Sequence, residues 1–272
     1  MLRAHGLTAD KRLGQHFLLD PSILARIAAA AGPLSGCAVV EIGPGPGGLT
    51  RALLAAGAAM VIAVERDPRC IAALAGLVDA AAGRLRLVHG DALDFQMEGL
   101  ADPGTLRLVA NLPYNIGTEL LVRWLQRPEP FHSLTVLLQK EVVARLVAAP
   151  GSADYGRLSV LAQTVAHVRS LLDLPGAAFV PPPKVTSSLV QLVPSVERPP
   201  ATVRRAMERV TAAAFGQRRK MLRRSLAGCT PMAPLLLERA LIAGDRRAET
   251  LSLLEFRRLA ELLLALEASG TA

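Results

Sequence analysis

The sequence of 272 residues predicts an α/β fold with a mainly parallel sheet, followed by a small all-helical domain. Up to about residue 194, short runs rich in Val, Ile and Leu alternate with longer helical segments. Strands that are apolar on both faces are typical of parallel sheets covered by helices. After the proline-rich stretch "PSVERPP" only helical patterns follow. We therefore expect two domains, 1–196 and 197–272.

The elements of the first domain follow from local patterns. A helix is expected after Asp20, because an acidic N-cap followed by proline suits the first helical turn. Strands are expected in "CAVVEIG", "MVIAVE", "RLRLVHGD", "LRLVANLP" and "LTVLLQ", separated by helices at 49–56, 68–82 and 118–126. The runs "HVRSLLDL" and "SSLVQLVP" are expected to close the sheet as a pair.

The second domain is predicted to contain helices over 201–214, 215–227, 233–243 and 252–268. Ser252 and Glu255 form a capping-box pattern at the start of the last helix.

Composition limits the function. The hydrophobic fraction of 51% is ample for a core, and a net charge of +8 favours a polyanionic partner such as nucleic acid. Three separated cysteines without a CxxC pair argue against a zinc site or a disulfide framework, so no metal is expected and a reducing cytosol is the natural compartment. No signal peptide and no membrane-spanning run are evident. We expect a soluble, cytoplasmic protein.

A glycine-rich turn follows the first of the alternating strands. Gly43, Gly45 and Gly48 satisfy GxGxxG, which alone suits NAD nearly as well as S-adenosylmethionine. Prolines at positions 44 and 46 remove backbone N–H groups that a pyrophosphate would need. Glu41 would repel a pyrophosphate but suits a sulfonium or an amino group. The turn therefore favours S-adenosylmethionine.

Two further carboxylates end neighbouring strands. Glu65 can accept from both ribose hydroxyls of a cofactor, and Asp91, followed by Ala92, is placed to accept from the adenine amino group. Each alone is as readily a solvated carboxylate. Together they meet at the carboxyl edge of the sheet, where α/β proteins bind ligands.

The stretch "LVANLPYNIG" ends the fourth strand with groups suited to an adenine amine. Asn111 offers a neutral carbonyl oxygen, and Pro113 holds Leu112 extended, which can turn the Leu112 carbonyl toward the pocket. Tyr114 can stack on an extruded base. The alternative is a proline-ended strand with a capping amide and a buried tyrosine.

Over nearly its whole length the sequence resembles the bacterial small-subunit rRNA adenine N6,N6-dimethyltransferases. The resemblance rests on "KRLGQHFL", "EIGPGPGGLT", "GDAL", "NLPYNI", "QKEVVARL", "DYGRLSV", "FVPPPKVTSSLV" and "AAFGQRRKMLRRSL". It implies a Rossmann-like class I methyltransferase sheet with an antiparallel last strand. It also implies dimethylation of two adjacent adenosines in the 3′-terminal hairpin of 16S rRNA, linked to small-subunit assembly. The expected partner is the immature 30S subunit, and we expect a monomer.

Carried over motif by motif, the resemblance places His16 and Leu18 at the methionine end of the cofactor. It places Asn111 at the reacting centre and sandwiches the target base between Tyr114 and Phe179. The family often has asparagine at the position of His16, so cofactor binding here could depend on pH near neutrality.

The run "FGQRRKMLRRSL" is the candidate RNA surface. Its cations, expected to contact phosphates, are Arg218, Arg219, Lys220, Arg223 and Arg224. A solvated helix face is the alternative, but no acidic residue compensates the charge.

Three other functions share parts of this pattern. A 23S rRNA methyltransferase of the macrolide-resistance type would share the catalytic motifs, although the basic run matches it less well. A nicotinamide oxidoreductase would need a proton relay beside the glycine turn, and none is evident. A non-catalytic assembly factor would tolerate loss of Asn111 or Tyr114, and both are present.

Overall fold

The computed structural model describes residues 7–97, 99–102, 104–128, 130–217 and 219–270. The chain folds into two compact units, the first made of Met1–Val143 and Val168–Pro194, the second of Ala144–His167 and Ser195–Ala272. The chain passes for the last time from the first unit to the second between Pro194 and Ser195, close to the boundary expected at residue 196. Residues 144–167 were expected in the first domain but belong to the second unit, because Tyr155 and Val160 pack in its core.

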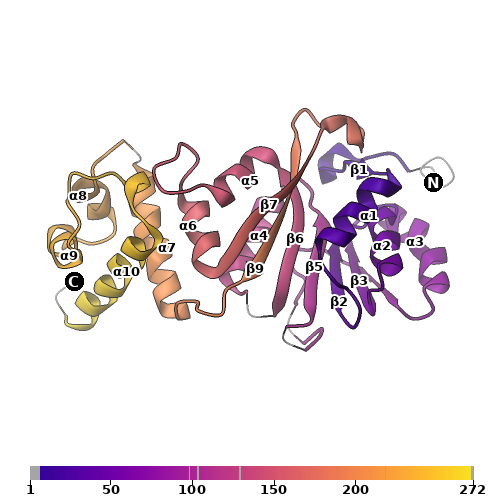
Figure 1. Cartoon of the computed structure of the whole chain (residues 1–272), viewed down its shortest axis with the longest axis horizontal. Coiled ribbons are helices and arrows are strands. Elements are labelled where there is room, and N and C mark those ends of the chain that lie inside the picture. Colours follow the sequence, from indigo (N-terminus) through magenta and orange to yellow (C-terminus); the bar gives the residue numbers. More distant parts are fainter. Residues whose placement is uncertain (1–6, 98, 103, 129, 218, 271–272) are drawn as a thin grey trace. The chain divides into compact units, whose positions relative to one another are not determined.

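The first unit is built on a large mixed sheet (Figure 1). In the described part of the chain this sheet has seven strands in the order β4-β3-β2-β5-β6-β9-β7. The strands are β2 (Ala38–Ile42), β3 (Met60–Glu65), β4 (Leu85–His89), β5 (Leu106–Asn111), β6 (Phe131–Gln139), β7 (Ala166–Leu174) and β9 (Ser187–Pro194).

Strand direction fixes where a ligand can bind. The pairs β2–β3, β2–β5, β3–β4 and β5–β6 are parallel, so the carboxyl ends of β2 to β5 meet at one edge. Strand β9 runs antiparallel to β6, with Ser187 opposite Gln139. The predicted alternating strands, the closing pair and the antiparallel strand beside β6 are thus confirmed.

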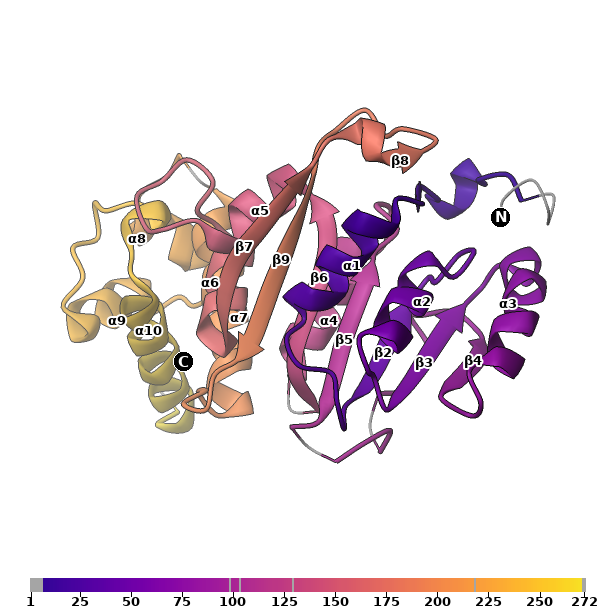
Figure 2. The ribbon, with the colours of Figure 1, turned by 45° about the vertical axis from the view of Figure 1, so that its right-hand side comes forward.

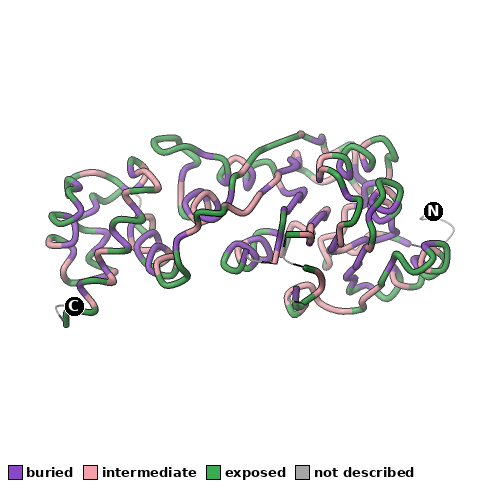
Figure 3. The backbone as a smooth tube through the Cα atoms, turned by 60° about the horizontal axis from the view of Figure 1, so that its bottom comes forward, coloured by how far each residue is buried: buried purple, intermediate pink, exposed green. Residues whose placement is uncertain are grey.

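Helices cover both faces of this sheet. Figure 2 shows α1 and α2 in front of the strands and α4 behind them. The helices are α1 (Pro21–Ala30), α2 (Gly48–Ala55), α3 (Pro68–Ala80), α4 (Gly117–Gln126) and α5 (Lys140–Val147), whose last turn belongs to the second unit. Asp20 caps α1 as predicted, accepting from the Ser22 amide at 2.8 Å. The central strands β2, β3 and β5 are buried along most of their length. Figure 3 shows how buried and exposed stretches alternate along the backbone.

A second, two-stranded sheet joins distant motifs. Strand β1 (Phe17–Leu18) pairs antiparallel with β8 (Phe179–Val180), and the short helical turns η2 (Lys11–Leu13) and η3 (Gly176–Ala178) precede them. The N-terminal segment therefore lies beside the loop that leads into β9.

The second unit is helical. Its helices are α6 (Arg157–Val165), α7 (Ala201–Gly216), α8 (Leu222–Ser225), α9 (Ala233–Ala240) and α10 (Leu253–Ala268), with the turns η4 (Leu226–Gly228) and η5 (Ala248–Thr250). Its core includes Phe256 and Leu259 of α10 and Val210 of α7, all fully buried. None of the helices in the described residues is long and apolar enough to cross a bilayer.

The helix predicted over 215–227 is wrong. Helix α7 ends at Gly216, and only the four residues from Leu222 are helical before η4. The amides of Leu222 and Arg223 donate to the carbonyl oxygens of Arg246 and Gly244, at 2.8 and 3.0 Å. These two carbonyls from a distant loop take the place of the carbonyls that the preceding turn of a continuous helix would supply. Spacing cations four residues apart would also have destabilised a continuous helix.

The capping box of α10 generates a stability prediction. The Ser252 hydroxyl accepts from the Glu255 amide at 3.2 Å, and the Glu255 carboxylate accepts from the Ser252 amide at 2.7 Å. Ser252→Ala should lower the free energy of unfolding by about 1 kcal/mol, because one helix-end N–H loses its acceptor. Urea unfolding followed by far-UV circular dichroism measures the change. Arg257→Ala, in the same helix but outside the cap, is the control; equal effects of the two would contradict the prediction.

Candidate active site

A pocket opens at the carboxyl edge of the large sheet. Its walls come from the N-terminal segment, the turn after β2, the ends of β3 and β4, and the turn after β5. All nine residues predicted to bind cofactor line it: His16, Leu18, Glu41, Gly43, Gly45, Glu65, Asp91, Ala92 and Asn111. Leu112, Pro113 and Tyr114 line it too. The pocket lies wholly within the first unit.

The glycine turn needs its glycines. Gly43 and Gly45 have φ of +66° and +55°, a left-handed backbone that side chains disfavour. A Cβ on Gly45 would lie 3.0 Å from the Phe17 ring, so the turn also lets β1 approach closely. The Gly45 amide donates to the Glu65 carboxylate at 3.0 Å. The turn is therefore tied to the end of β3 rather than open to an anion.

Glu41 is a buried acid with one unpartnered oxygen beneath this turn. Its side chain is 1% exposed, and its Oε2 has no hydrogen-bond partner in the described residues. Burial, reinforced by the nearby Glu65 carboxylate, raises the pKa of Glu41 to about 8. An orphaned buried carboxyl that lines a pocket is suited to a cationic ligand, which would stabilise its ionised form.

Glu65 and Asp91 already have partners. The Glu65 carboxylate accepts from the amides of Arg66 and Asp67, each at 2.8 Å, in addition to Gly45. Burial raises the pKa of Glu65, although these amides favour its ionised form. Asp91 pairs with Arg66 at 3.0 Å. A ribose or an adenine would have to share these oxygens, so the roles predicted for both acids stay predictions.

One end of the Asn111 side-chain amide is already hydrogen-bonded within the protein. Its Nδ2 donates to the backbone oxygen of His16 at 3.0 Å, which leaves its Oδ1 as the acceptor. The Pro113 carbonyl accepts from the Gly117 amide at 2.8 Å at the start of α4. Helix α4 therefore uses the Pro113 carbonyl as an acceptor at its N-terminal end. Leu112 lines the pocket, and the role predicted for its carbonyl stays a prediction.

Tyr114 contacts two other segments. Its ring centroid lies 5.3 Å from that of His16, with 30° between the planes. Its hydroxyl hydrogen-bonds to Ser187 at the start of β9. The His16 Nδ1 lies 2.8 Å from the Pro181 carbonyl oxygen, which can only accept, so Nδ1 carries the proton.

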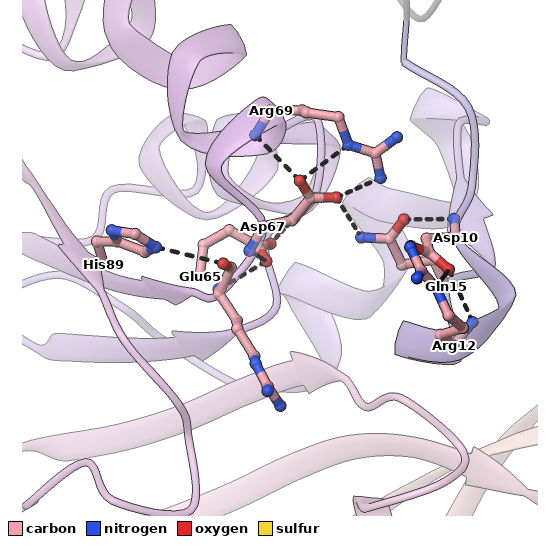
Figure 4. Close-up of polar contacts among 9 residues, drawn as sticks. Asp10, Arg12, Gln15, Glu65, Asp67, Arg69 and His89 are labelled. Atoms are coloured by element: carbon pink, nitrogen blue, oxygen red, sulfur yellow. Dashed lines mark hydrogen bonds and ion pairs between the residues drawn. The ribbon is translucent and has the colours of Figure 1, made fainter.

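The N-terminal segment is fastened across this edge (Figure 4). Gln15 bridges two elements, accepting from the Asp10 amide and donating to the Asp67 carboxylate, both at 2.9 Å. Asp67 also pairs with Arg69 at 2.7 Å, and that guanidinium holds the pKa of Asp67 well below its usual value. This segment thus forms a fixed wall of the pocket.

Phe179 is placed differently from the expectation. Its side chain is 2% exposed and packs in the core of the first unit, outside the pocket lining formed by the described residues. It reaches the site indirectly, because it pairs with Leu18 between β8 and β1. Its part in a base sandwich stays a prediction.

The basic run lies in the second unit. Arg218 lies outside the described residues, whereas Arg219, Lys220, Arg223 and Arg224 are all exposed. Within the described chain, none of these four pairs with an acidic side chain.

Sequence reasoning missed three contributors to the site. Arg66 follows Glu65 directly, so its position after a strand end was an available signal. Gln15 and Ser187 act through partners 52 and 73 residues away, and no local pattern marks them.

Comparison with known proteins gives the family. A family model described as ribosomal RNA adenine dimethylase matches residues 6–264. The chain is 53% identical to the ribosomal RNA small subunit methyltransferase A of Azorhizobium caulinodans, over 100% of this chain and 94% of that protein. It is also similar to the crystal structure of a dimethyladenosine transferase from Plasmodium falciparum (TM-score 0.79, 24% identity, 94% and 98% of the chains). The crystal structure of the 23S rRNA methyltransferase ErmE matches with a TM-score of 0.68 at 26% identity, over 90% and 98% of the chains.

The burial of the Glu41 carboxyl predicts that the free energy of unfolding depends on pH. Because its pKa is raised to about 8, the folded protein binds a proton that the unfolded chain releases above its ordinary pKa of 4.5. The protonated Glu41 carboxyl therefore contributes its full share of stability below pH 4.5, and this contribution is lost as the pH rises toward 8. Relative to wild type, Glu41→Gln should gain roughly 3 kcal/mol of unfolding free energy between pH 5 and 7.

Urea unfolding followed by the fluorescence of Trp124 measures this gain, because the single tryptophan lies in α4 of the first unit. Parallel pH dependences of wild type and variant would refute the assignment.

Proposed function

Because the chain belongs to the ribosomal RNA adenine dimethylase family and is an rRNA adenine dimethyltransferase, we propose that it dimethylates N6 of two adjacent adenosines in the 3′-terminal hairpin of 16S rRNA, with S-adenosylmethionine as methyl donor. The observation that carries the proposal is the fixed amide of Asn111, a residue that lines the pocket together with Tyr114. The proposed partner is the immature 30S subunit, the proposed compartment the cytoplasm, and the proposed state a monomer.

Relatives support the small subunit over the large one. The Azorhizobium protein, whose name specifies the small subunit, matches at 53% identity, compared with 26% for the 23S rRNA enzyme. Both matches cover at least 90% of this chain, so the difference lies in the residues rather than in the length compared. The 23S rRNA reading is therefore the weaker one.

The pocket fits S-adenosylmethionine. The buried Glu41 with its orphaned Oε2 suits the positive charge of the sulfonium or the amino group. The glycine turn allows close approach of a ligand to backbone, and Pro44 and Pro46 within it supply no N–H for a phosphate. When bound, this cofactor supplies an electrophilic methyl group. We propose that Glu65 binds its ribose and Asp91, with Ala92, its adenine.

The residues of the β5 turn would activate the target amine. The adenine amine is a weak nucleophile, because its lone pair is delocalised into the ring. We propose that Asn111 Oδ1 and the Leu112 carbonyl each accept one N–H of the amine, which favours a pyramidal nitrogen with its lone pair toward the methyl group. Tyr114 would stack on the extruded base. No ionised base is needed for this orientation.

Phosphate contacts would come from the second unit. Four exposed cations without acidic partners in the described chain, Arg219, Lys220, Arg223 and Arg224, support an RNA surface there. The α8 backbone is fixed by its hydrogen bonds to residues 244 and 246, so the side chains of Arg223 and Arg224 extend from a fixed backbone.

The first test of function is methyl transfer to small ribosomal subunits that lack adenine dimethylation, comparing wild type with Asn111→Ala. Wild type should place label in N6,N6-dimethyladenosine of 16S rRNA. The variant should be slower by about 10²–10³-fold, the usual loss for one preorganised hydrogen-bonding group at a reacting centre. Urea unfolding of both proteins, followed by far-UV circular dichroism, separates lost chemistry from lost folding.

The other functions have their own signatures in this assay. Transfer to protein-free 23S rRNA instead of to the subunits would reassign the enzyme to the resistance type. Tight subunit binding without any transfer would leave a non-catalytic assembly factor.

A second test concerns the basic surface. Replacing Arg223 and Arg224 together by alanine should weaken subunit binding and reduce the slope of log K against log salt concentration by about 1 per cation. Binding of S-adenosylmethionine should be unchanged. Arg257→Ala is the matched control, because Arg257 is an exposed cation of the same unit that already pairs with Glu261 at 2.8 Å. A wild-type salt slope in the double variant would exclude these two residues from the RNA surface.

A further inference from the structure

Tyr114 is anchored at its hydroxyl by Ser187, a residue outside the pocket lining. Resting on the function proposed above, we propose that Ser187 is a positioning residue that holds Tyr114 in place, and that the second of the two methyl transfers to each adenosine depends on this anchor more than the first.

The anchor is rigid on the Ser187 side. Ser187 is fully buried and opens β9, where it lies opposite Gln139 in the antiparallel ladder with β6. A strand held by such a ladder fixes the direction of its side chains. The hydroxyl of Ser187 therefore offers Tyr114, which lies in the turn after β5, a fixed reference point on β9.

The ring is constrained from a second direction. The His16 ring lies beside it, with centroids 5.3 Å apart, and the His16 Nδ1 is tied to the Pro181 carbonyl at 2.8 Å. Without the Ser187 contact, Tyr114 would keep its neighbour His16 but could turn about its own side-chain bonds. The hydroxyl contact thus decides the plane on which a base could stack.

The two methyl transfers to one adenosine differ in how many hydrogen bonds the target amine can donate to the site. In each, the N6 lone pair forms the new N–C bond as the C–S bond breaks, the bonding electrons stay on sulfur to give S-adenosylhomocysteine, and N6 releases one proton to water. An unmethylated amine has two N–H groups for the Asn111 and Leu112 oxygens. After one methylation a single N–H remains, so one of the two acceptors loses its donor.

Stacking on Tyr114 must then supply a larger share of the interactions that hold the base in place. Base–aromatic stacking does not depend on the hydrogens of N6, so it persists through both steps. A loosened Tyr114 should consequently impair the second transfer more than the first.

The chain supplies a matched control at the next position. Ser188 is also buried, but successive strand side chains point to opposite faces, and its hydroxyl donates to Asp173 at 2.5 Å. Asp173 in turn pairs with Lys140 at 2.7 Å. Ser188→Ala therefore removes a buried hydroxyl and one hydrogen bond from the same strand without touching Tyr114.

The experiment is single-turnover methylation of small subunits that lack the modification, with monomethyl- and dimethyladenosine quantified over time. Ser187→Ala should slow the second transfer by about tenfold and the first by no more than about threefold, so monomethyladenosine accumulates. The KM for S-adenosylmethionine should stay at its wild-type value. Tyr114→Phe deletes only the other partner of the contact and should reproduce this pattern, and the double variant should be no slower than either single one.

Ser188→Ala should show the wild-type ratio of the two products. The inference is overturned if Ser187→Ala behaves like Ser188→Ala, if both transfers slow equally, or if the effects of Ser187→Ala and Tyr114→Phe multiply. Tyr114→Phe keeps the test decisive even where Ser187→Ala does not fold. Failure of the proposed function is separate, because wild type itself would then form no dimethyladenosine in 16S rRNA.

Discussion

One hydrogen bond organises the candidate site, the one from the Asn111 amide to the backbone oxygen of His16. It engages the NH2 end of the Asn111 amide and leaves the amide oxygen as an acceptor for a ligand. It also joins the end of β5 to the N-terminal segment, which in turn places the His16 ring beside Tyr114. The orientation of the amide, the wall of the pocket and the environment of the tyrosine thus meet at one contact between residues 95 positions apart.

The buried Glu41 shows what such a site costs the fold. A carboxyl with an unpartnered oxygen beneath the glycine turn destabilises the empty protein at neutral pH. No packing requirement explains an acid there, since glutamine has nearly the same shape. The neighbouring acid, Glu65, is by contrast satisfied by three backbone amides and also holds the turn in shape. Burial therefore raises the pKa of both carboxyls on these adjacent strands, and the one with an unpartnered oxygen is the better indicator of a cationic ligand.

Local sequence was enough for the sheet and for the location of the pocket. Alternating apolar runs fix the strands, and parallel strands bring their ends together, so Glu41, Glu65, Asp91 and Asn111 had to converge. The failures involve distant partners. The helix expected after Phe215 is interrupted because the amides of Leu222 and Arg223 bond to a loop more than twenty residues later. The pairing of Phe179 with Leu18 likewise joins segments that no spacing rule connects, and the role expected for Phe179 stays a prediction.

The short pairing of β1 with β8 has a practical consequence for handling the protein. Only two residues of each segment pair, yet this contact and the Gln15 bridge hold the stretch that supplies both His16 contacts. Shortening the chain to the start of α1 would keep every strand of the large sheet and the whole helical unit in the chain while removing one wall of the pocket. Such a protein could pass every check of purity and fold and still be inert. An affinity tag is therefore better fused after α10, in the other unit, than before this stretch.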